Sequence, residues 1–170
     1  MSDVNEFPEP DISAMEVSDA EVERYLNGEV ELRDLLGLDT QLLEQIKGRA
    51  QFFVDGEHSE RALILLEMLE ELDRNDRTAS LIAIEVLLRE GLSDRAQAKV
   101  EMLLTRAPED PDVLVAKAQY ELAVGRWHEA AATLERVIEA DPGAEAEATQ
   151  RALVLAQAAH AEFEASRGVS

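Results

Sequence analysis

The chain contains no cysteine, which excludes disulfides, thiolate zinc sites and cysteine nucleophiles and leaves the fold indifferent to the redox compartment. No apolar run approaches the roughly 18 residues that a membrane-spanning helix needs. The N-terminal stretch MSDVNEFPEPDISAMEVSDAE is acidic and lacks an apolar core, so it does not resemble a secretory signal peptide. We therefore expect a soluble, cytoplasmic protein.

Basic residues are scarce. The sequence has 16 Lys and Arg residues against 37 Asp and Glu residues, which gives a formal net charge of -21. This balance argues against binding to nucleic-acid phosphates or to anionic membrane surfaces, because both require clustered positive charge. It is compatible with a solvated acidic surface or with a basic protein partner.

Residues suited to catalysis or metal binding form no recognisable motif. The histidines His58, His128 and His160 are predicted to be surface or packing residues, since HEAAATLE lacks the second histidine of the zinc-protease spacing. The acidic clusters do not follow the calcium-loop pattern. We therefore expect no enzymatic activity, no metal and no cofactor.

Aromatic residues make up only 4% of the chain, whereas Ala, Leu, Glu and Arg are abundant. Because these four are strong helix formers, the composition predicts an all-α protein. Residues 1–17, with two prolines and five acidic residues, are predicted to be a flexible acidic leader. The pattern of residues 18–37 then predicts an amphipathic helix or a helical pair. It starts at a capping box formed by Ser18 and Glu21. Gly28 is a possible break between two helices, and Gly37 is the expected end.

The apolar side chains of segment 18–37 need a partner, either the rest of the domain or a second copy of the chain. We therefore treat this segment as a candidate homodimer surface. The candidate residues are Tyr25, Leu26, Leu32, Leu35 and Leu36.

A sequence pattern recurs every 34 residues. RALILLEML at 61–69 returns as RAQAKVEML at 95–103. The same spacing relates four sets of positions: Ala62, Ala96 and Ala130; Leu66, Val100 and Leu134; Leu69, Leu103 and Val137; and Ala50, Ile84, Ala118 and Ala152. Turns are expected near Gly56, Gly91 and Gly125. Residues 40–144 thus predict three helical hairpins.

The 34-residue period with small residues at these places resembles the tetratricopeptide repeat (TPR). The resemblance implies a superhelix of stacked hairpins in which no hairpin buries its apolar face alone. Residues 145–167 are predicted to form a capping helix. Its apolar residues Leu153, Leu155 and Phe163 would cover the last hairpin, while Glu145, Glu147, Gln150 and Arg151 would face water.

Three further side chains have two possible roles. Trp127 either packs inside the turn of its repeat or is an exposed anchor for a partner. Met68 and Met102 sit at equivalent positions, and they either fill the packing of the second helices or contribute to an adaptable binding surface.

In the TPR fold, the first helix of each hairpin lines a concave groove. The candidate groove residues are Lys47, Gln51, Val54, Leu81, Glu85, Leu88, Val115, Gln119 and Leu122. TPR grooves that clamp acidic chaperone tails are rich in Lys, Arg and Asn, whereas here Leu81 and Val115 occupy the places that match Lys47. The groove is therefore predicted to bind a protein or peptide segment with apolar anchors.

An N-terminal helix, three repeats and a capping helix in a short acidic chain resemble the class II chaperones of bacterial type III secretion, which keep apolar translocator subunits soluble before export. The layout of ERYLNGEVELRDLLGLDTQLLEQIKGRAQFFVDGEHSERALILLEMLEELD carries the resemblance. The grooves of these chaperones are richer in Tyr and Phe, of which this chain has two and four. The resemblance implies a secretion chaperone, and the alternative is a structural adaptor within a larger bacterial assembly.

Overall fold

The computed structural model describes residues 17–167, and its side chains as far as residue 161. The described residues contain helices and no strands, which confirms the predicted all-α class. The helices are α1 (Asp19–Leu26), α2 (Leu32–Leu35), α3 (Thr40–Asp55), α4 (Ser59–Leu72), α5 (Thr78–Arg89), α6 (Ser93–Arg106), α7 (Pro111–Ala123), α8 (Trp127–Ala140) and α9 (Glu147–Arg167). None of these helices is both long and apolar enough to span a membrane.

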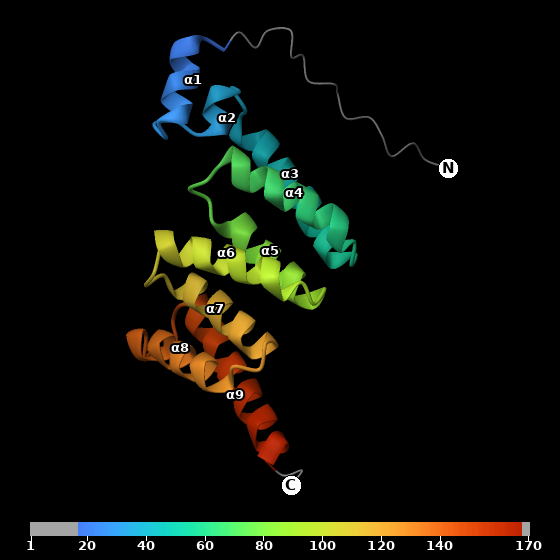
Figure 1. Cartoon of the computed structure of the whole chain (residues 1–170), viewed down its shortest axis with the longest axis vertical. Helices are drawn as coiled ribbons and strands as arrows, with labels where there is room; N and C mark the ends of the chain where they lie inside the picture. Colours follow the sequence, from blue (N-terminus) through green and yellow to red (C-terminus); the bar gives the residue numbers. More distant parts are fainter. Residues whose placement is uncertain (1–16, 168–170) are drawn as a thin grey trace, which may run out of the picture.

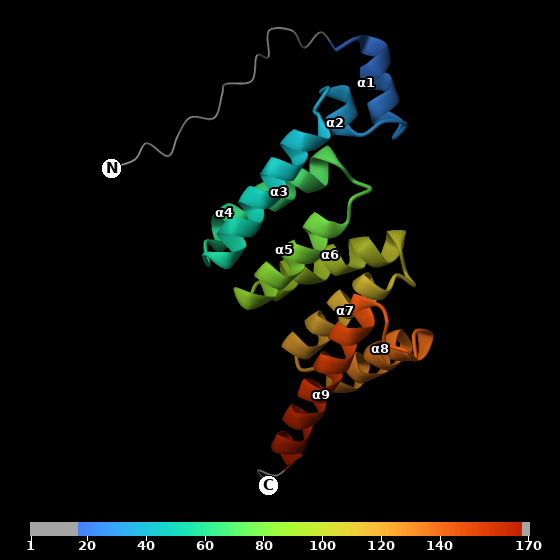
Figure 2. The ribbon, with the colours of Figure 1, turned by 180° about the vertical axis from the view of Figure 1, so that it is seen from behind.

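The hairpins α3–α4, α5–α6 and α7–α8 stack one after another, with α1 and α2 at one end and α9 at the other (Figures 1 and 2). The second helices start at residues 59, 93 and 127, so each begins 34 residues after the one before it. The sequence period is therefore the length of one hairpin together with its connections.

The repeated positions form the core, as predicted. The side chains of Ala62, Ala96 and Ala130 are 0% exposed, and the aliphatic positions that follow them are buried in all three hairpins. An alanine allows two helix backbones to approach closely, and the aliphatic side chains one and two turns later fill the space between neighbouring hairpins. Ala50, Ile84, Ala118 and Ala152 are also fully or almost fully buried.

The helix ends follow the local chemistry of the sequence. The Ser18–Glu21 capping box is present, with the Glu21 N–H donating to Ser18 Oγ at 3.3 Å and the Ser18 N–H donating to Glu21 Oε2 at 2.8 Å. Gly28, with φ at 74°, adopts a left-handed conformation that glycine tolerates well. Segment 18–37 is therefore a helical pair. Asp39 caps α3 by accepting from the Leu42 N–H at 2.7 Å.

The predicted leader, except for Val17, lies outside the described residues, and so does the side chain of Phe163. Of the other two apolar residues expected to cover the last hairpin, Leu155 packs against the cluster of buried residues on α7 and α8, and Leu153 is half-buried.

Candidate functional site

A single hollow runs along the first helices of the three hairpins and onto α9. Its volume is about 460 Å³, and we call it the groove. Its lining residues are Val54 on α3; Glu85, Val86, Leu88 and Arg89 on α5; Gln119, Leu122 and Ala123 on α7; and Arg151 and Leu155 on α9. A second hollow of about 420 Å³ continues along α9 past Val154, and it shares Gln119, Arg151 and Leu155 with the groove.

Five of the nine predicted groove residues line this hollow, namely Val54, Glu85, Leu88, Gln119 and Leu122. Lys47 and Gln51 lie instead along a smaller hollow of about 240 Å³ between α3, α4 and α5. Leu81 is half-buried and packs against the main core.

Val115 was wrongly assigned to the groove. Its side chain is 0% exposed and belongs to a core cluster with Ala148 and Ala152 of α9. The helix α9 lies against the face of α7 that carries Val115, so this position faces the next first helix and not the groove. Lys47, which lies at the equivalent position on α3, likewise reaches Asp76 just before α5.

The Lys47 ammonium is already paired within the chain. Its Nζ lies 2.6 Å from Asp76 Oδ2 and 3.2 Å from Glu44 Oε1. Partial burial of Asp76 acts to raise its pKa, but hydrogen bonds from Lys47 and Thr78 outweigh burial and lower the pKa to about 2. The hydrogen bond to Asp76 in turn raises the pKa of Lys47, and this effect outweighs desolvation. Lys47 therefore joins α3 to the start of α5 and does not act as a free clamp for an acidic ligand.

The groove contains an ion pair that joins distant parts of the sequence. Arg151 Nη2 on α9 lies 2.5 Å from Glu85 Oε1 on α5, and Arg151 Nη1 lies 4.0 Å from Asp112 Oδ1. Arg151 was expected to face water; its side chain is 35% exposed and also pairs with Glu85 of α5. The signal was present in the sequence: Ala152 continues the series of small residues of the first helices, so its neighbours belong to the groove.

Gln119 carries an acceptor that the described residues leave unmatched. Its Oε1 is buried and has no hydrogen-bond partner among them. An unsatisfied buried acceptor costs about 1–3 kcal/mol. Gln119 borders both hollows, but this oxygen is not exposed to either of them.

The candidate dimer surface is only partly available. Leu32 and Leu36 are half-buried and pack against the main core, so only part of each side chain is open to a second copy. Leu35 is half-buried. The hydroxyl of Tyr25 accepts a hydrogen bond from Arg74 at 2.9 Å, whereas Leu26 is 73% exposed.

The segment around α2 is tied to the loop after α4. The carboxylate of Glu31 accepts from the Arg74 N–H at 2.9 Å and from Asn75 Nδ2 at 2.6 Å, and Arg33 Nη1 lies 2.7 Å from Asp73 Oδ2. The α1 helix has no buried residue, and Val22 on it is 38% exposed. The exposed large apolar side chains of this segment are therefore on α1, and Val22 is one that the candidate dimer set does not include.

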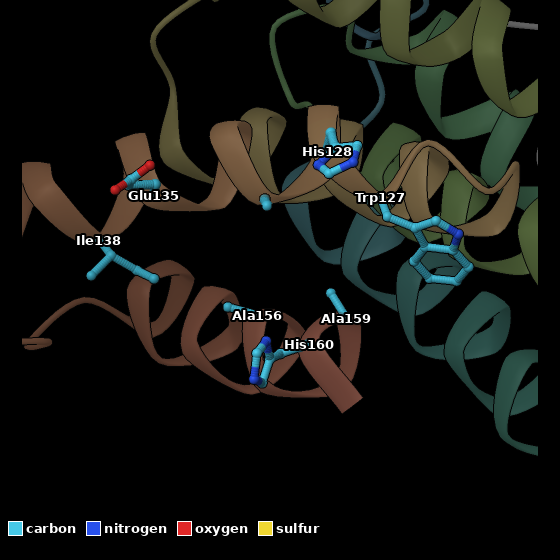
Figure 3. A pocket seen from close by; sticks show the side chains of 8 residues that line it. Trp127, His128, Glu135, Ile138, Ala156, Ala159 and His160 are labelled. Carbon is cyan, nitrogen blue, oxygen red and sulfur yellow. The ribbon is translucent and has the colours of Figure 1, made fainter. Parts of the chain in front are cut away.

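Trp127, His128 and His160 line a separate cleft between α8 and α9 (Figure 3). Trp127 is half-buried, as a turn-packing residue would be, but it also borders this cleft. His58 lies at the edge of the Phe53 ring, with the ring centroids 6.1 Å apart. Met68 is 39% exposed and Met102 is half-buried. Within residues 17–161 no group of three or more His, Asp or Glu side chains is arranged to hold a metal ion.

Comparison with known proteins yields no match to a protein-family model and none to a curated protein sequence. Solved structures do match. A T3SS complex from Aeromonas hydrophila aligns with a TM-score of 0.67 at 17% identity, over 86% of this chain and 99% of the matched chain. The type III secretion translocator chaperone SycD of Yersinia enterocolitica aligns with a TM-score of 0.66 at 20% identity, over 76% of this chain and 98% of that one.

A third solved structure, MamA 41-end from Desulfovibrio magneticus RS-1, aligns with a TM-score of 0.50 at 14% identity, over 86% of this chain and 92% of the matched chain. At these identities the similarity establishes a shared fold. The chain therefore has the TPR-like superhelical fold that is also found in the translocator chaperone SycD.

Proposed function

We propose that the protein is a bacterial type III secretion chaperone that holds an apolar segment of a client protein in the groove and so keeps that client soluble in the cytoplasm. The groove carries this proposal: it is a continuous hollow across four helices, lined largely by aliphatic side chains. The structural similarity to a translocator chaperone and to a T3SS complex supports the same function.

The proposed mechanism is burial, with no covalent step. Val54, Leu88, Leu122 and Leu155 lie on four different helices, so an apolar segment along the groove would contact each in turn. Burying one aliphatic anchor contributes about 1.5–3 kcal/mol, from which the cost of ordering the bound segment is subtracted. Two or three anchors would thus give a reversible grip, which suits a client that is later released for export.

The groove is tested by introducing charge at its floor. We would co-express the chain with apolar translocator subunits and measure the soluble fraction of each subunit. The double variant Leu88→Glu and Leu122→Glu should abolish solubilisation, because a client apolar segment would then face two carboxylates. Ile64→Glu is the matched control, since Ile64 is a 61% exposed aliphatic residue of α4 outside the groove.

Both proteins must be folded for this comparison, so circular dichroism and thermal melting accompany it. If Leu88→Glu and Leu122→Glu together destabilise the fold, the single change Leu122→Glu provides the second test, since it places only one carboxylate in the groove. A folded groove variant that solubilises the client as well as the wild type does would refute the proposal.

We further propose that α1 forms a homodimer contact. Val22 and Leu26 lie four residues apart, and therefore on one face of α1, and both are exposed. An isolated helix of eight residues is marginal in water, so α1 gains the most from a second helix packed against it.

A structural adaptor is the second candidate, and one observation favours it. Ile64 and Met68 lie one turn apart on α4 and are 61% and 39% exposed, which gives α4 an apolar patch that points away from the core. If the protein is an adaptor, Ile64→Glu should prevent it from binding to its complex. The groove variants should then bind to the complex as the wild type does. The same two sets of variants therefore distinguish the two functions.

A further inference from the structure

The helix α9 begins as the first helix of a fourth hairpin would. Ala152 lies 34 residues after Ala118 and is likewise fully buried. A turn would then be due at position 159, since Gly125 makes the preceding turn with φ at 77°. The residue there is Ala159, and α9 runs on for 21 residues in total, against 12 and 13 for α5 and α7. Within residues 17–167, no second helix follows α9 to pack against α8.

A cleft of about 370 Å³ lies between α8 and α9 on this side. Its apolar lining is Trp127, Ala131 and Ile138 on α8, together with Ala156 and Ala159 on α9. Figure 3 shows the labelled side chains of the two helices facing each other across this space. On α8 the lining residues Trp127, Ala131, Glu135 and Ile138 follow one another at intervals of four, four and three residues. They therefore form a stripe along one face of that helix, which is the shape that another helix would cover.

Two ion pairs join α6 to the equivalent positions of α4. Arg95 Nη2 of α6 lies 2.7 Å from Glu67 Oε1, and Lys99 Nζ lies 2.5 Å from Glu70 Oε2. The two basic residues are four apart, so they lie on one face of α6. The helix α6 thus places two cations on carboxylates of α4, whereas the equivalent positions of α8 are Glu129 and Thr133.

Two repeats later, Glu135 and Ile138 stand where Glu67 and Glu70 stand on α4. Both line the cleft, and Glu135 is exposed with no ion-pair partner among the described residues. A helix packed in the same way would bring a cation to Glu135. It would bring an aliphatic side chain, in place of the second cation, to Ile138.

We propose that the α8–α9 cleft binds an amphipathic helix of a partner protein, in which an Arg or Lys precedes an aliphatic residue by four positions. The cation pairs with Glu135, and the aliphatic residue packs on Ile138 between the two helices. A basic helix is favoured over a second copy of this chain because the chain has a formal net charge of -21. This surface is separate from the groove, so the proposal does not depend on the proposed client chaperone function.

The test uses the full-length protein and a synthetic peptide of residues 91–107 that carries Lys99→Leu, with Asp94→Gln and Glu101→Gln to keep the peptide basic. This peptide keeps Arg95 and places a leucine four residues after it. Trp127 is the only tryptophan of the chain and lines the cleft, so its fluorescence reports binding directly. Anisotropy of a dye-labelled peptide gives the dissociation constant independently.

Ala131→Arg should weaken peptide binding at least tenfold by filling the cleft. Ala132→Arg is the matched control, because Ala132 is the next residue of α8, is exposed and does not line the cleft. Glu135→Lys should weaken binding at least tenfold, and an Arg95→Glu version of the peptide should restore it. The groove variant Leu88→Glu with Leu122→Glu should bind the peptide as the wild type does, which separates this proposal from the proposed function.

The proposal is overturned if the peptide does not bind at millimolar concentration, or if Ala131→Arg and Ala132→Arg have equal effects. It is also overturned if the wild type is a dimer that Ala131→Arg converts into a monomer, because a second copy would then occupy the cleft.

Discussion

Arg151 on α9 contacts Glu85 on α5 across the groove, with 2.5 Å between Nη2 and Oε1 and 66 positions between the two residues in the sequence. The helix that ends the superhelix is therefore also a wall of the groove. A bound segment that lies along α5 and α7 would meet this ion pair, so the pair is a boundary of the site as well as a link between helices.

The Arg151–Glu85 pair is expected to contribute little to stability. The two side chains are 35% and 48% exposed, and ion pairs of this exposure contribute about 0.2–1 kcal/mol. Urea unfolding of Arg151→Ala, Glu85→Ala and the double variant should give a coupling free energy within that range, which falls as salt is added. A coupling above about 2 kcal/mol would contradict this and would indicate a desolvated pair.

Asp76 should make the free energy of unfolding depend on pH in the acidic range. Its folded pKa of about 2 lies below its usual 3.8, so the unfolded chain binds the proton more readily. The stabilisation that ionised Asp76 gives the folded state is therefore fully present above about pH 4. It is lost as the pH falls from about 4 to about 2. Screening by solvent reduces it to about 1 kcal/mol.

Asp76→Asn isolates this effect, because asparagine keeps an acceptor for the Thr78 N–H but cannot pair with Lys47 as an ion. The difference in unfolding free energy between wild type and variant should be largest at pH 5 and should shrink towards pH 2. Comparing the two proteins at each pH removes the background of the other carboxylates. A difference that stays constant with pH would mean that the ion pair does not form in solution.

The repeated alanine is expected to be intolerant of larger side chains. Ala96 is 0% exposed between packed helices, and overfilling such a position costs about 1–3 kcal/mol. Ala96→Leu should therefore lower the free energy of unfolding by this amount in urea titrations. Ala98→Leu, at an exposed position of the same helix, should change it by less than about 0.5 kcal/mol. Equal effects of the two changes would remove the packing explanation of the 34-residue period.

The core could be predicted from the sequence because its signal is periodic. Ala62, Leu66 and Leu69 occupy equivalent places in three hairpins, and each is buried as its counterparts are. Because the same apolar positions recur in three hairpins, the sequence shows which side chains are buried between neighbouring hairpins. The fold follows from this pattern, since each hairpin needs the next one to bury its apolar side.

The groove could be predicted only in part, because it depends on how the hairpins are stacked. Glu85 and Leu88 line the groove, whereas Val115, which was assigned by the same count, is buried. A count along one helix does not show which neighbour covers each face. The role of Arg151 was missed because segment 145–167 was treated as a cap, although Ala152 continues the period of the first helices.

The exposed face of α1 leads to the last prediction, on the oligomeric state. Leu26 and Val22 are 73% and 38% exposed on a helix that has no buried residue, whereas Leu32 and Leu36 are already used inside the chain. Two α1 helices related by a two-fold axis would bury four such side chains and would give each short helix a partner.

Sedimentation velocity should therefore show a dimer for the wild type and a monomer for the double variant Val22→Glu and Leu26→Glu. Val154→Glu is the control, because Val154 is a 66% exposed aliphatic residue of α9, and α9 lies at the other end of the stack from α1 (Figure 1). Slower amide exchange in α1 at high protein concentration would locate the contact. A wild type that stays monomeric at every concentration, or a dimer that survives the α1 substitutions, would show that α1 is not the dimer surface, and its apolar side chains would then remain available to another protein.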